Sequence, residues 1–429
     1  MATPTADTLS VPAGTAVVYG GRAGGAAAPF TVRADGIWTW FTAPEAIQLG
    51  DYLYVGWVDS TGKCGATQVH IPTQAVKQFA LSSAIEIDDH NNASMLRLSD
   101  GRIVFFFGTH NDQLTRYRIY DGSGDFADAA SWGAVVTFGM GQGPYSYPNP
   151  CRLSNDPTRS WLFQRRWTDG TANSRALAYR SIVNLGDAGA VWGAYTDVVK
   201  RSNFAPYWRL TYDGVGRVHV AITDGHPQQG QISLYHLYGD IGVGGAIAWF
   251  KSDGAPISAS LPMAPTDASL VYDGSVTRCW VSDCAIGPDA RPRILYMRYP
   301  GNDGYAIEYW HARWTGAAWV SSKVTDDGAG LYGAERYYHG GLRFDANDVA
   351  RVYLSAPISG VRHVQEWRSA DSGATWSMQR ALTSGGTAGT PLRARPVSPR
   401  THDGRISVLW WEGQYTSYTS FMTDLKGAG

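Results

Sequence analysis

The stretch Ser369-Ala-Asp-Ser-Gly-Ala-Thr-Trp376 decides the fold class of this 429-residue chain. It has the pattern S-x-D-x-G-x-T-W, in which the Asp and the Ser or Thr cap a hairpin turn through bonds to the local backbone. The Trp that ends the pattern packs between strands. The stretch therefore predicts two antiparallel strands joined by a tight turn, and it carries no information about activity.

Runs of alternating apolar residues recur throughout the rest of the chain. Three of them, at 102–107, 217–222 and 405–411, each begin just after a turn that contains Gly. Such runs are typical of short strands joined by tight turns. Together with 50 Gly, 17 Trp and 24 Tyr, they predict an all-β protein without long helices.

A larger unit also repeats, consisting of a start segment, a polar turn, a strand, a loop and an aromatic-rich strand. A single sheet of this kind cannot bury both of its faces, so repeated sheets are expected to close into one ring. We therefore predict an all-β, seven-bladed β-propeller with four-stranded antiparallel blades, forming one domain over residues 1–429, in which residues 1–40 add a strand that closes the ring. The units open near Pro44, His90, Tyr147, Tyr207, Asp267, Tyr338 and Arg395.

Charge and hydropathy exclude several classes of partner. Lys+Arg 36 against Asp+Glu 37 leaves a net charge of −1, so the chain lacks the basic field of a nucleic-acid-binding protein. It contains no apolar run of about 18 residues that would insert into a membrane. The first residues lack the basic and apolar parts of a secretory signal. We expect a monomer that is extracellular, its signal being absent from this sequence, or that is carried on a phage particle.

The four cysteines show no C-x-x-C pair and no zinc-finger spacing, which argues against a structural zinc site made from cysteine. A short disulfide between Cys279 and Cys284 and a pair of free or buried thiols both fit the sequence.

Residues at the starts of the repeats are the candidates for chemistry. In a propeller the innermost strand of each blade begins near the central funnel, so these starts converge on one face. They supply histidines, tyrosines and arginines, with no pair of carboxylates. The set consists of Asp89-His90, His110, Tyr147, Arg165-Arg166, Tyr207 and Tyr338-His339.

This composition favours elimination over hydrolysis. Most glycoside hydrolases need two carboxylates, one as acid and one as nucleophile or base. A lyase that acts on a uronate needs a cation to neutralise the substrate carboxylate, a base for the C5 hydrogen and an acid for the departing O4. Arginine, histidine and tyrosine suit these three roles. The set therefore predicts cleavage of an acidic, uronate-containing polysaccharide by β-elimination, with no cofactor required for the chemistry.

Short motifs in the same order resemble a known family. They are DDHNN around His90, GTHND around His110, YSYPNP around Tyr147, APYWRL around Tyr207, ITDGHP around His226 and YYHGGL around His339, followed by the Asp box quoted first. The chain resembles the BNR-like propeller family that includes ulvan lyases, and it is similar to L-rhamnose-α-1,4-D-glucuronate lyases. The resemblance extends from about residue 85 to 420.

The resemblance implies specific roles. It places the paired active-site histidines of the family on His90 and His110, and its catalytic tyrosine on Tyr147. The arginine that neutralises the substrate carboxylate falls on Arg166. A small insertion at 155–159 leaves Arg165 open for that role.

The resemblance and the repeat starts also indicate substrate-binding residues. Tyr207 matches the second substrate-facing tyrosine of the family. His226 is either a ligand-binding residue or a lock for its own turn, and Tyr338 and His339 are expected to face the substrate or line the central channel. A structural or channel-bound divalent cation such as Ca²⁺ stays open, and the zinc ligands of some relatives have no clear match.

Two other functions fit parts of the pattern. The Asp box also occurs in sialidase-like hydrolases, which would need three converging arginines and a Tyr/Glu pair. A non-catalytic carbohydrate-binding propeller would keep the aromatic residues and lose the His, Tyr and Arg set. The specific polysaccharide stays undetermined, with a rhamnosyl-glucuronate polymer as the expectation.

Overall fold

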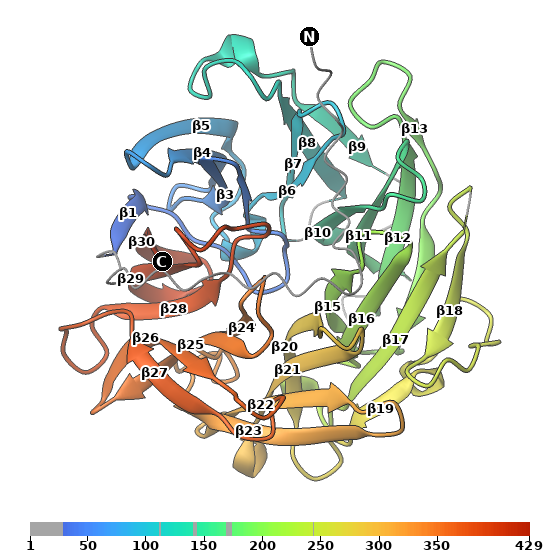
Figure 1. Ribbon diagram of the computed structural model, residues 1–429, viewed down its shortest axis with the longest axis vertical. Coiled ribbons are helices and arrows are strands. Elements are labelled where there is room, and N and C mark those ends of the chain that lie inside the picture. Colours follow the sequence, from blue (N-terminus) through green and yellow to red (C-terminus); the bar gives the residue numbers. More distant parts are fainter. Residues whose placement is uncertain (1–28, 111–112, 140–143, 169–173, 243) are drawn as a thin grey trace.

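The computed structural model describes residues 29–110, 113–139, 144–168, 174–242 and 244–429. Seven antiparallel sheets stand side by side around a central axis (Figure 1). The described residues contain no α-helix. Their only helices are five 3-10 turns: η1 (Asp89–Asn91), η2 (Ala129–Ser131), η3 (Pro227–Gln229), η4 (Pro265–Asp267) and η5 (Pro300–Asn302).

The first four blades follow one another along the chain, and each runs from an innermost to an outer strand. The third and fourth blades each carry one additional strand, β14 on β12 and β19 on β17. Their strands are β2 (Ala46–Leu49), β3 (Tyr52–Val58), β4 (Lys63–His70) and β5 (Ala75–Ala84); β6 (Ser94–Arg97), β7 (Ile103–Gly108), β8 (Leu114–Tyr120) and β9 (Val136–Gly139); β10 (Tyr145–Arg152), β11 (Arg159–Trp167), β12 (Arg175–Val183), β13 (Val191–Trp192) and β14 (Thr196–Lys200); β15 (Tyr207–Tyr212), β16 (Arg217–Thr223), β17 (Leu234–Ile241), β18 (Ile247–Lys251) and β19 (Ser269–Tyr272).

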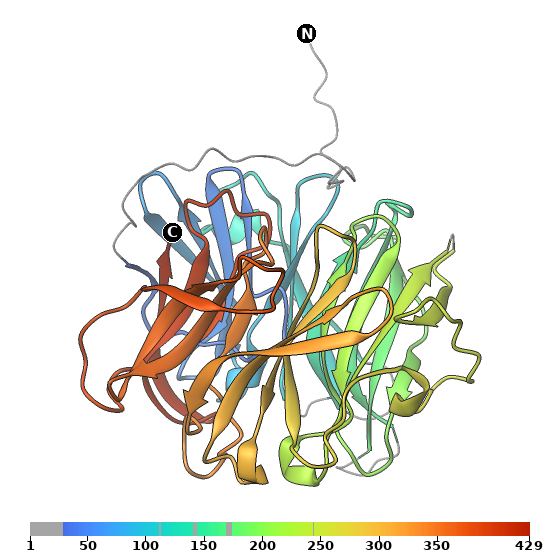
Figure 2. The ribbon, with the colours of Figure 1, turned by 60° about the horizontal axis from the view of Figure 1, so that its bottom comes forward.

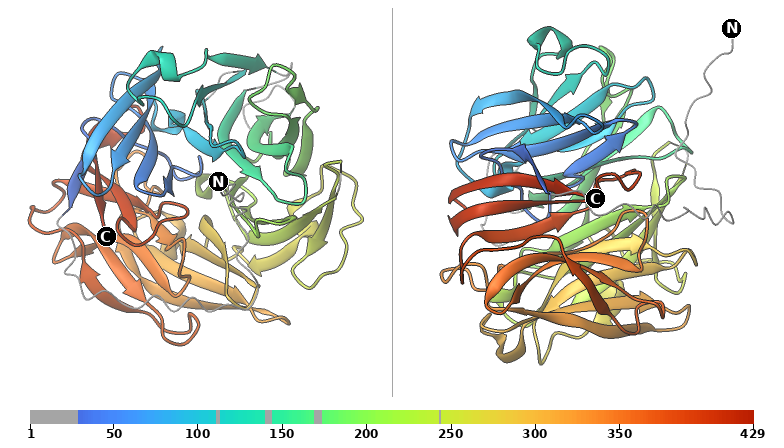
Figure 3. Two further views of the ribbon diagram at one scale, coloured as in Figure 1. Left: turned by 45° about the horizontal axis from the view of Figure 1, so that its top comes forward. Right: turned by 60° about the vertical axis from the view of Figure 1, so that its left-hand side comes forward.

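The last three blades complete the ring, which Figures 2 and 3 show from the side and from two tilted directions. The prediction of seven four-stranded antiparallel blades is confirmed. These strands are β20 (Cys279–Ile286), β21 (Pro292–Arg298), β22 (Ile307–Trp314) and β23 (Trp319–Gly328); β24 (Leu342–Phe344), β25 (Arg351–Ile358), β26 (Val361–Arg368) and β27 (Ser377–Ala381); β28 (Leu392–Val397), β29 (Val408–Ser417), β30 (Ser420–Ala428) and β1 (Phe30–Arg33).

One predicted repeat start is displaced. Asp267 does not open the fifth blade, whose innermost strand β20 begins at Cys279. The run after Asp267 instead forms β19, which pairs with β17 of the fourth blade. The alternating pattern of Ser269–Tyr272 fits an outer strand as well as an inner one, and for this reason periodicity alone misplaced the boundary.

The seventh blade joins the two ends of the described chain. Strand β1 pairs antiparallel with β30, with Phe30 opposite Gly427 and Thr31 opposite Lys426. Arg33 extends from β1 to the first blade, where its guanidinium carbon lies 3.6 Å from the ring centre of Trp57. In both views of Figure 3 the blade with the C-terminal strands lies beside the first blade. The expected closing segment 1–40 thus supplies β1, and its residues 1–28 lie outside the described part.

Residues 37–44, between β1 and β2, cross the centre of the ring, where Trp40 and Phe41 pack on aromatic rings from several blades. The indole nitrogen of Trp38 donates to the carbonyl of Arg395 at 2.9 Å. The carbonyl of Phe41 accepts a bond from the side chain of Asn149 at 2.8 Å. The carbonyl of Trp40 accepts one from Arg343 at 2.9 Å. Because the partners Arg395, Asn149 and Arg343 come from three different blades, the segment ties the blades together at the axis.

The Asp box forms the predicted capped turn between β26 and β27. One carboxylate oxygen of Asp371 accepts the backbone N–H of Thr375 at 2.8 Å, and the other accepts its hydroxyl at 2.6 Å. Gly373 has φ +88, and a Cβ there would lie 2.1 Å from the ring of His311, so only glycine fits.

The four cysteines are buried and free, so Cys279 and Cys284 form no disulfide. No helix in the described ranges is long and apolar enough to cross a membrane.

Candidate active site

Five of the predicted residues, His90, His110, Tyr147, Arg165 and Tyr207, lie together at one end of the second, third and fourth blades. The ring of Tyr147, in β10, lies 5.7 Å from that of His90 in η1, 6.3 Å from that of His110 and 6.1 Å from that of Tyr207 at the start of β15. Residues that are far apart in sequence thus share one site, as the convergence of the repeat starts predicted.

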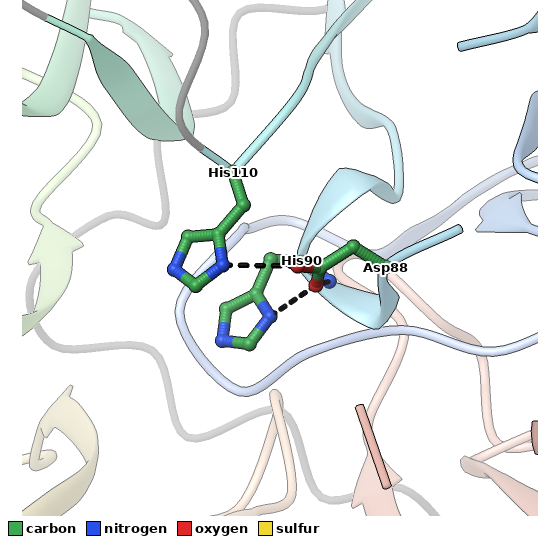
Figure 4. A group of neighbouring side chains, drawn as sticks. All are labelled: Asp88, His90 and His110. Carbon is green, nitrogen blue, oxygen red and sulfur yellow. Dashed lines mark hydrogen bonds and ion pairs between the residues drawn. The ribbon is translucent and has the colours of Figure 1, made fainter. Parts of the chain in front are cut away.

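Asp88 holds both histidines in one orientation. Its two carboxylate oxygens bond separately to Nδ1 of His90 at 2.5 Å and to Nδ1 of His110 at 3.0 Å. The two imidazole rings stack with centres 3.9 Å apart and planes 5° from parallel. Figure 4 shows that both Nε2 atoms consequently point the same way, away from Asp88.

Local sequence explains the position of His90. Asp88 is the N-cap of η1, and its side chain accepts the backbone N–H of His90 at 2.9 Å. Asp and Asn are favoured at such caps because their side-chain oxygens satisfy free N–H groups. The DDHNN motif therefore sets both the turn and the orientation of the ring.

The two histidines differ in charge. Burial opposes protonation of His90, but the carboxylates of Asp88 and Asp89 outweigh this effect and raise its pKa to about 10. Burial and the neighbouring charge of His90 lower the pKa of His110 to about 4. At neutral pH the pair therefore consists of an imidazolium and a neutral imidazole.

Asp89 connects this pair to the opposite side of the funnel. Its Oδ1 lies 3.0 Å from Nδ1 of His90, and its Oδ2 accepts bonds from Arg395 at 2.7 Å and from the hydroxyl of Tyr415 at 2.6 Å. The carboxylate is fully buried. Its ion pair with Arg395 keeps it charged, so it supports the charge on His90.

An irregularity in β10 turns Tyr147 into the site. Its φ is +59°, which is rare for a residue with a side chain, and the pairing with β11 shifts register between Ser146 and Asn149. Arg395, which also precedes a proline, has φ +51 in a similar register shift of β28. Such backbone strain is concentrated at functional sites.

The hydroxyl of Tyr147 is ready to donate. It is buried, and among the described residues it has no hydrogen-bond partner. Burial raises its pKa well above the ordinary value, and the positive charge of Arg165 only partly offsets this. The side chain is therefore a neutral phenol at neutral pH.

The structure places Arg165 in the cluster and Arg166 outside it, so its geometry favours Arg165 for the role that the sequence assigned to Arg166. Neighbours in a strand point to opposite faces. The guanidinium carbon of Arg165 lies 4.3 Å from the ring centre of Tyr147 and 5.0 Å from that of Tyr207. Arg166 instead pairs with Asp197 on the other face, with Nε 2.8 Å from the carboxylate.

Arg175, at the start of β12, is a second cation that sequence reasoning missed. Burial and the charge of Arg165 lower its pKa to about 10. Neither arginine forms an ion pair with an acidic residue in the described ranges. Arg175 opens the third strand of its blade, whereas the repeat starts that predict site residues lie on the innermost strands, so the sequence pattern does not point to it.

His226 and Tyr207 form the side of the cluster that belongs to the fourth blade. Their ring centres lie 5.7 Å apart, and His226 packs edge-on against Trp280 at 4.6 Å. Nδ1 of His226 also accepts the backbone N–H of Gln228 at 3.1 Å and so caps η3. Burial and the charge of Arg165 lower the pKa of His226 to about 3, so it is neutral. The structure is therefore compatible with both predictions for His226, a ligand-binding residue and a lock for its own turn.

Tyr338 and His339 lie at different depths. The ring of Tyr338 meets that of Trp40 edge-on at 4.7 Å and is 6.5 Å from that of Tyr418 at the rim. His339 is completely buried against Trp40, with ring centres 4.8 Å apart. Its ring nitrogens have no hydrogen-bond partner within the described part of the chain. Its position is that of a core residue of the axis.

Two further residues at the rim were missed. Oε1 of Glu335 lies 3.8 Å from Nε2 of His226, and burial raises the pKa of Glu335 to about 7. Tyr418 presents its ring to both histidines, 5.5 Å from His90 and 6.1 Å from His110. Both lie in loops between strands, where alternating patterns carry no information.

Asp88, His90 and His110 are also the group of described side chains whose ligand atoms lie close enough, within 4.8 Å, to hold a metal ion. Their geometry fits a metal poorly. Both Nδ1 atoms are bonded to Asp88, and the parallel rings direct their Nε2 atoms side by side, whereas metal ligands converge on one point. The prediction of a structural or channel-bound cation stays a prediction.

Comparison with known proteins gives the family. Residues 52–327, more than half of the chain, match the model described as BNR repeat-containing family member. The chain belongs to this family. No curated protein matches it.

Solved structures show the same fold. A PL25 ulvan lyase bound to -[GlcA(1-4)Rha3S]- matches with TM-score 0.69 and 13% identity, over 92% of this chain and 94% of that one. The polysaccharide lyase Uly1 matches with TM-score 0.60 and 12% identity, over 94% and 98%. The BP39L lectin from Burkholderia pseudomallei matches with TM-score 0.51 and 11% identity, over 89% and 93%. At these identities the likeness shows the fold alone.

Proposed function

We propose that this protein is a polysaccharide lyase that cleaves a 4-linked uronate by β-elimination and leaves a 4,5-unsaturated uronate. The observation that carries the proposal is Arg165, a fully buried cation with no acidic partner in the described ranges, lying over Tyr147 and Tyr207. A buried unpaired charge is costly unless a ligand of opposite charge completes it. A substrate carboxylate supplies that charge.

In the proposed reaction, separate side chains around Arg165 act as the base and as the acid. Arg165, assisted by Arg175, holds the uronate carboxylate and stabilises the enolate-like intermediate. The N–H at Nδ1 of His110 donates to Asp88, so Nε2 keeps its lone pair and accepts the C5 proton. The electrons of the C5–H bond form the C4=C5 double bond as the C4–O4 bond breaks. Tyr147 then gives its phenolic proton to O4.

His90 stabilises this arrangement through its positive charge. As an imidazolium held by Asp88 and Asp89, it offers a donor at Nε2 to the negative charge that develops on the substrate. No step of this scheme requires a cofactor.

The substrate we propose is an acidic polysaccharide containing rhamnosyl-glucuronate units. The ulvan lyase of the same fold was solved with -[GlcA(1-4)Rha3S]- bound, and this supports the choice. We further propose that the protein acts as an extracellular or phage-borne monomer, since such polymers occur outside cells.

The experiment is to incubate the protein with a panel of uronate polysaccharides and to follow the near-ultraviolet absorbance of the unsaturated product. The expected result is an increase with at least one polymer, absent for Tyr147→Phe. New reducing ends without this absorbance would indicate a sialidase-like hydrolase instead, and binding without cleavage would indicate a lectin.

A further inference from the structure

A polar cavity lies between the fourth and fifth blades, away from the cluster around Tyr147. It has a volume of about 230 Å³. Its walls come from β16, β17, the turn after β18, the turn before β21 and the end of β22, and they include His219, His236, Ser252, Asp253 and Trp314. His219 lies near the start of β16, whereas Thr223, which ends that strand, pairs with Tyr207 of the funnel. At about 3.3 Å per residue the two sites lie at opposite ends of the blade.

A chain of hydrogen bonds ends at His219, which lines this cavity. The indole of Trp319 donates to the hydroxyl oxygen of Ser252 at 3.0 Å, and Ser252 lies 2.8 Å from Nδ1 of His236. Nε2 of His236 lies 3.1 Å from Nδ1 of His219. The orientation that uses every proton has Ser252 donating to His236 and His236 donating to His219. His219 then carries its remaining proton on Nε2.

The buried histidine pair of the cavity is uncharged, whereas Arg217, Arg291 and Asp253 line its more exposed part. His219 is 4% exposed, and burial together with the charge of Arg217 lowers its pKa to about 4. Burial also lowers the pKa of His236 well below its ordinary value. Arg217 at the edge is already paired with Asp240 at 2.6 Å. The buried pair thus offers a neutral donor, which suits an uncharged ligand better than an anion.

We propose that this cavity is a second carbohydrate site, which binds a neutral pyranose unit. Sugar hydroxyls both donate and accept, and the cavity offers a donor at Nε2 of His219 and acceptors on the carboxylate of Asp253. Half-buried Trp314 adds a flat apolar wall for the C–H face of the ring. A polymer engaged here and in the funnel would be held by two contacts, so its apparent affinity would exceed that of either site.

The test measures binding without turnover, so its result does not depend on the proposed lyase reaction. L-rhamnose, D-glucose and D-glucuronate are titrated singly into the full chain and into Tyr147→Phe, with ligand-observed NMR as the readout. Saturable binding of a neutral sugar, equal in both proteins, is expected. Failure of every neutral sugar to saturate would overturn the proposal, and so would displacement of the sugar by inorganic sulfate.

Variants locate the binding. Trp314→Ala, His219→Phe and Asp253→Ala should each weaken it by about tenfold or more, as expected for the loss of one good contact. Asp253 is exposed, so its replacement tests the site even if the other two variants fold poorly. Trp192→Ala, which removes a half-buried Trp from the third blade, is the matched control and should bind normally. The proposed site would be refuted if Asp253→Ala bound the sugar with unchanged affinity and a folded Trp314→Ala or His219→Phe did so as well.

Discussion

Tyr147 carries the acid step of the proposed reaction, and its buried hydroxyl makes no bond to any described residue. Tyr147→Phe therefore removes no native hydrogen bond seen in this structure and keeps the ring packing. We expect its melting temperature to stay within a few degrees of wild type while turnover falls by roughly 10²–10⁴-fold. Tyr145→Phe, in the same strand but stacked on Tyr195, is the control and should stay active. Full activity of Tyr147→Phe would remove Tyr147 from the mechanism.

The adjacent arginines offer a paired experiment on charge neutralisation. Arg165→Lys keeps the charge and loses the planar fork that binds a carboxylate through two bonds. We expect kcat/KM to fall by about 100-fold or more, corresponding to roughly 3 kcal/mol of lost transition-state binding. Arg166→Lys, on the face that pairs with Asp197, should stay within a few-fold of wild type. The reverse pattern would restore the assignment made from sequence.

Asp88 sets the charge difference between the two histidines, so Asp88→Asn should change the pH dependence. In the folded protein the pKa of His90 is raised to about 10. Its protonated form therefore stabilises the native state below its ordinary pKa of about 6.5, and this contribution is lost as pH rises through about 10. In Asp88→Asn both the loss of stability and the loss of activity on the basic side should move to lower pH. Melting temperatures and kcat measured from neutral to alkaline pH check this, and unchanged profiles would contradict it.

At the scale of elements, a hydrogen bond to the segment at 37–44 holds the irregular part of β10 in place. The side-chain amide of Asn149 donates to the carbonyl of Phe41 at 2.8 Å and to that of Tyr147 at 2.9 Å. Asn149→Ala leaves both buried carbonyls without this donor, so the free energy of unfolding should fall by about 1–3 kcal/mol. Because Tyr147 also loses its anchor, kcat should fall as well.

A matched variant separates these two effects. Asn155→Ala removes a side-chain bond to the carbonyl of Ile241 at 2.6 Å, in the turn at the far end of the same blade. It should lower stability without lowering kcat. Denaturant titration and steady-state kinetics on both variants make the comparison, and equal kcat values would show that the bulge positions itself without Asn149.

Sequence patterns predicted the blades and most residues of the candidate site. They predicted only part of the geometry of that site. Alternation and turn residues predicted the seven sheets, since each blade repeats the same local rules. They misplaced the start near Asp267, where an outer strand has the alternation of an inner one. The face to which Arg165 or Arg166 points depends on register, and one residue of shift reverses it. Loop residues such as Glu335 and Tyr418 reach the site only through the closure of the ring.

At the scale of the whole molecule, ring closure depends on the few residues of β1. Val32 is 1% exposed, and Arg33 lies over Trp57 of the next blade at 3.6 Å while its Nη2 lies 3.5 Å from Asp59. The strand therefore supplies the outer edge of the seventh blade and a contact to the first. Without this strand β30 would lose its outer hydrogen-bonding partner, and the junction between the first and last blades would be weaker.

Comparison of two truncations tests this closure. Deletion of residues 1–34 should lower the free energy of unfolding by roughly 3–5 kcal/mol relative to deletion of residues 1–28, because it exposes the core around Val32 and removes the β1–β30 hydrogen bonds. If the blades unfold as one cooperative unit, the loss shifts a single transition in every probe. Calorimetry and denaturant unfolding followed by tryptophan fluorescence measure it. Equal stability of the two truncated proteins would show that β1 does not hold the ring closed, and two separated transitions would show that the blades do not unfold as one domain.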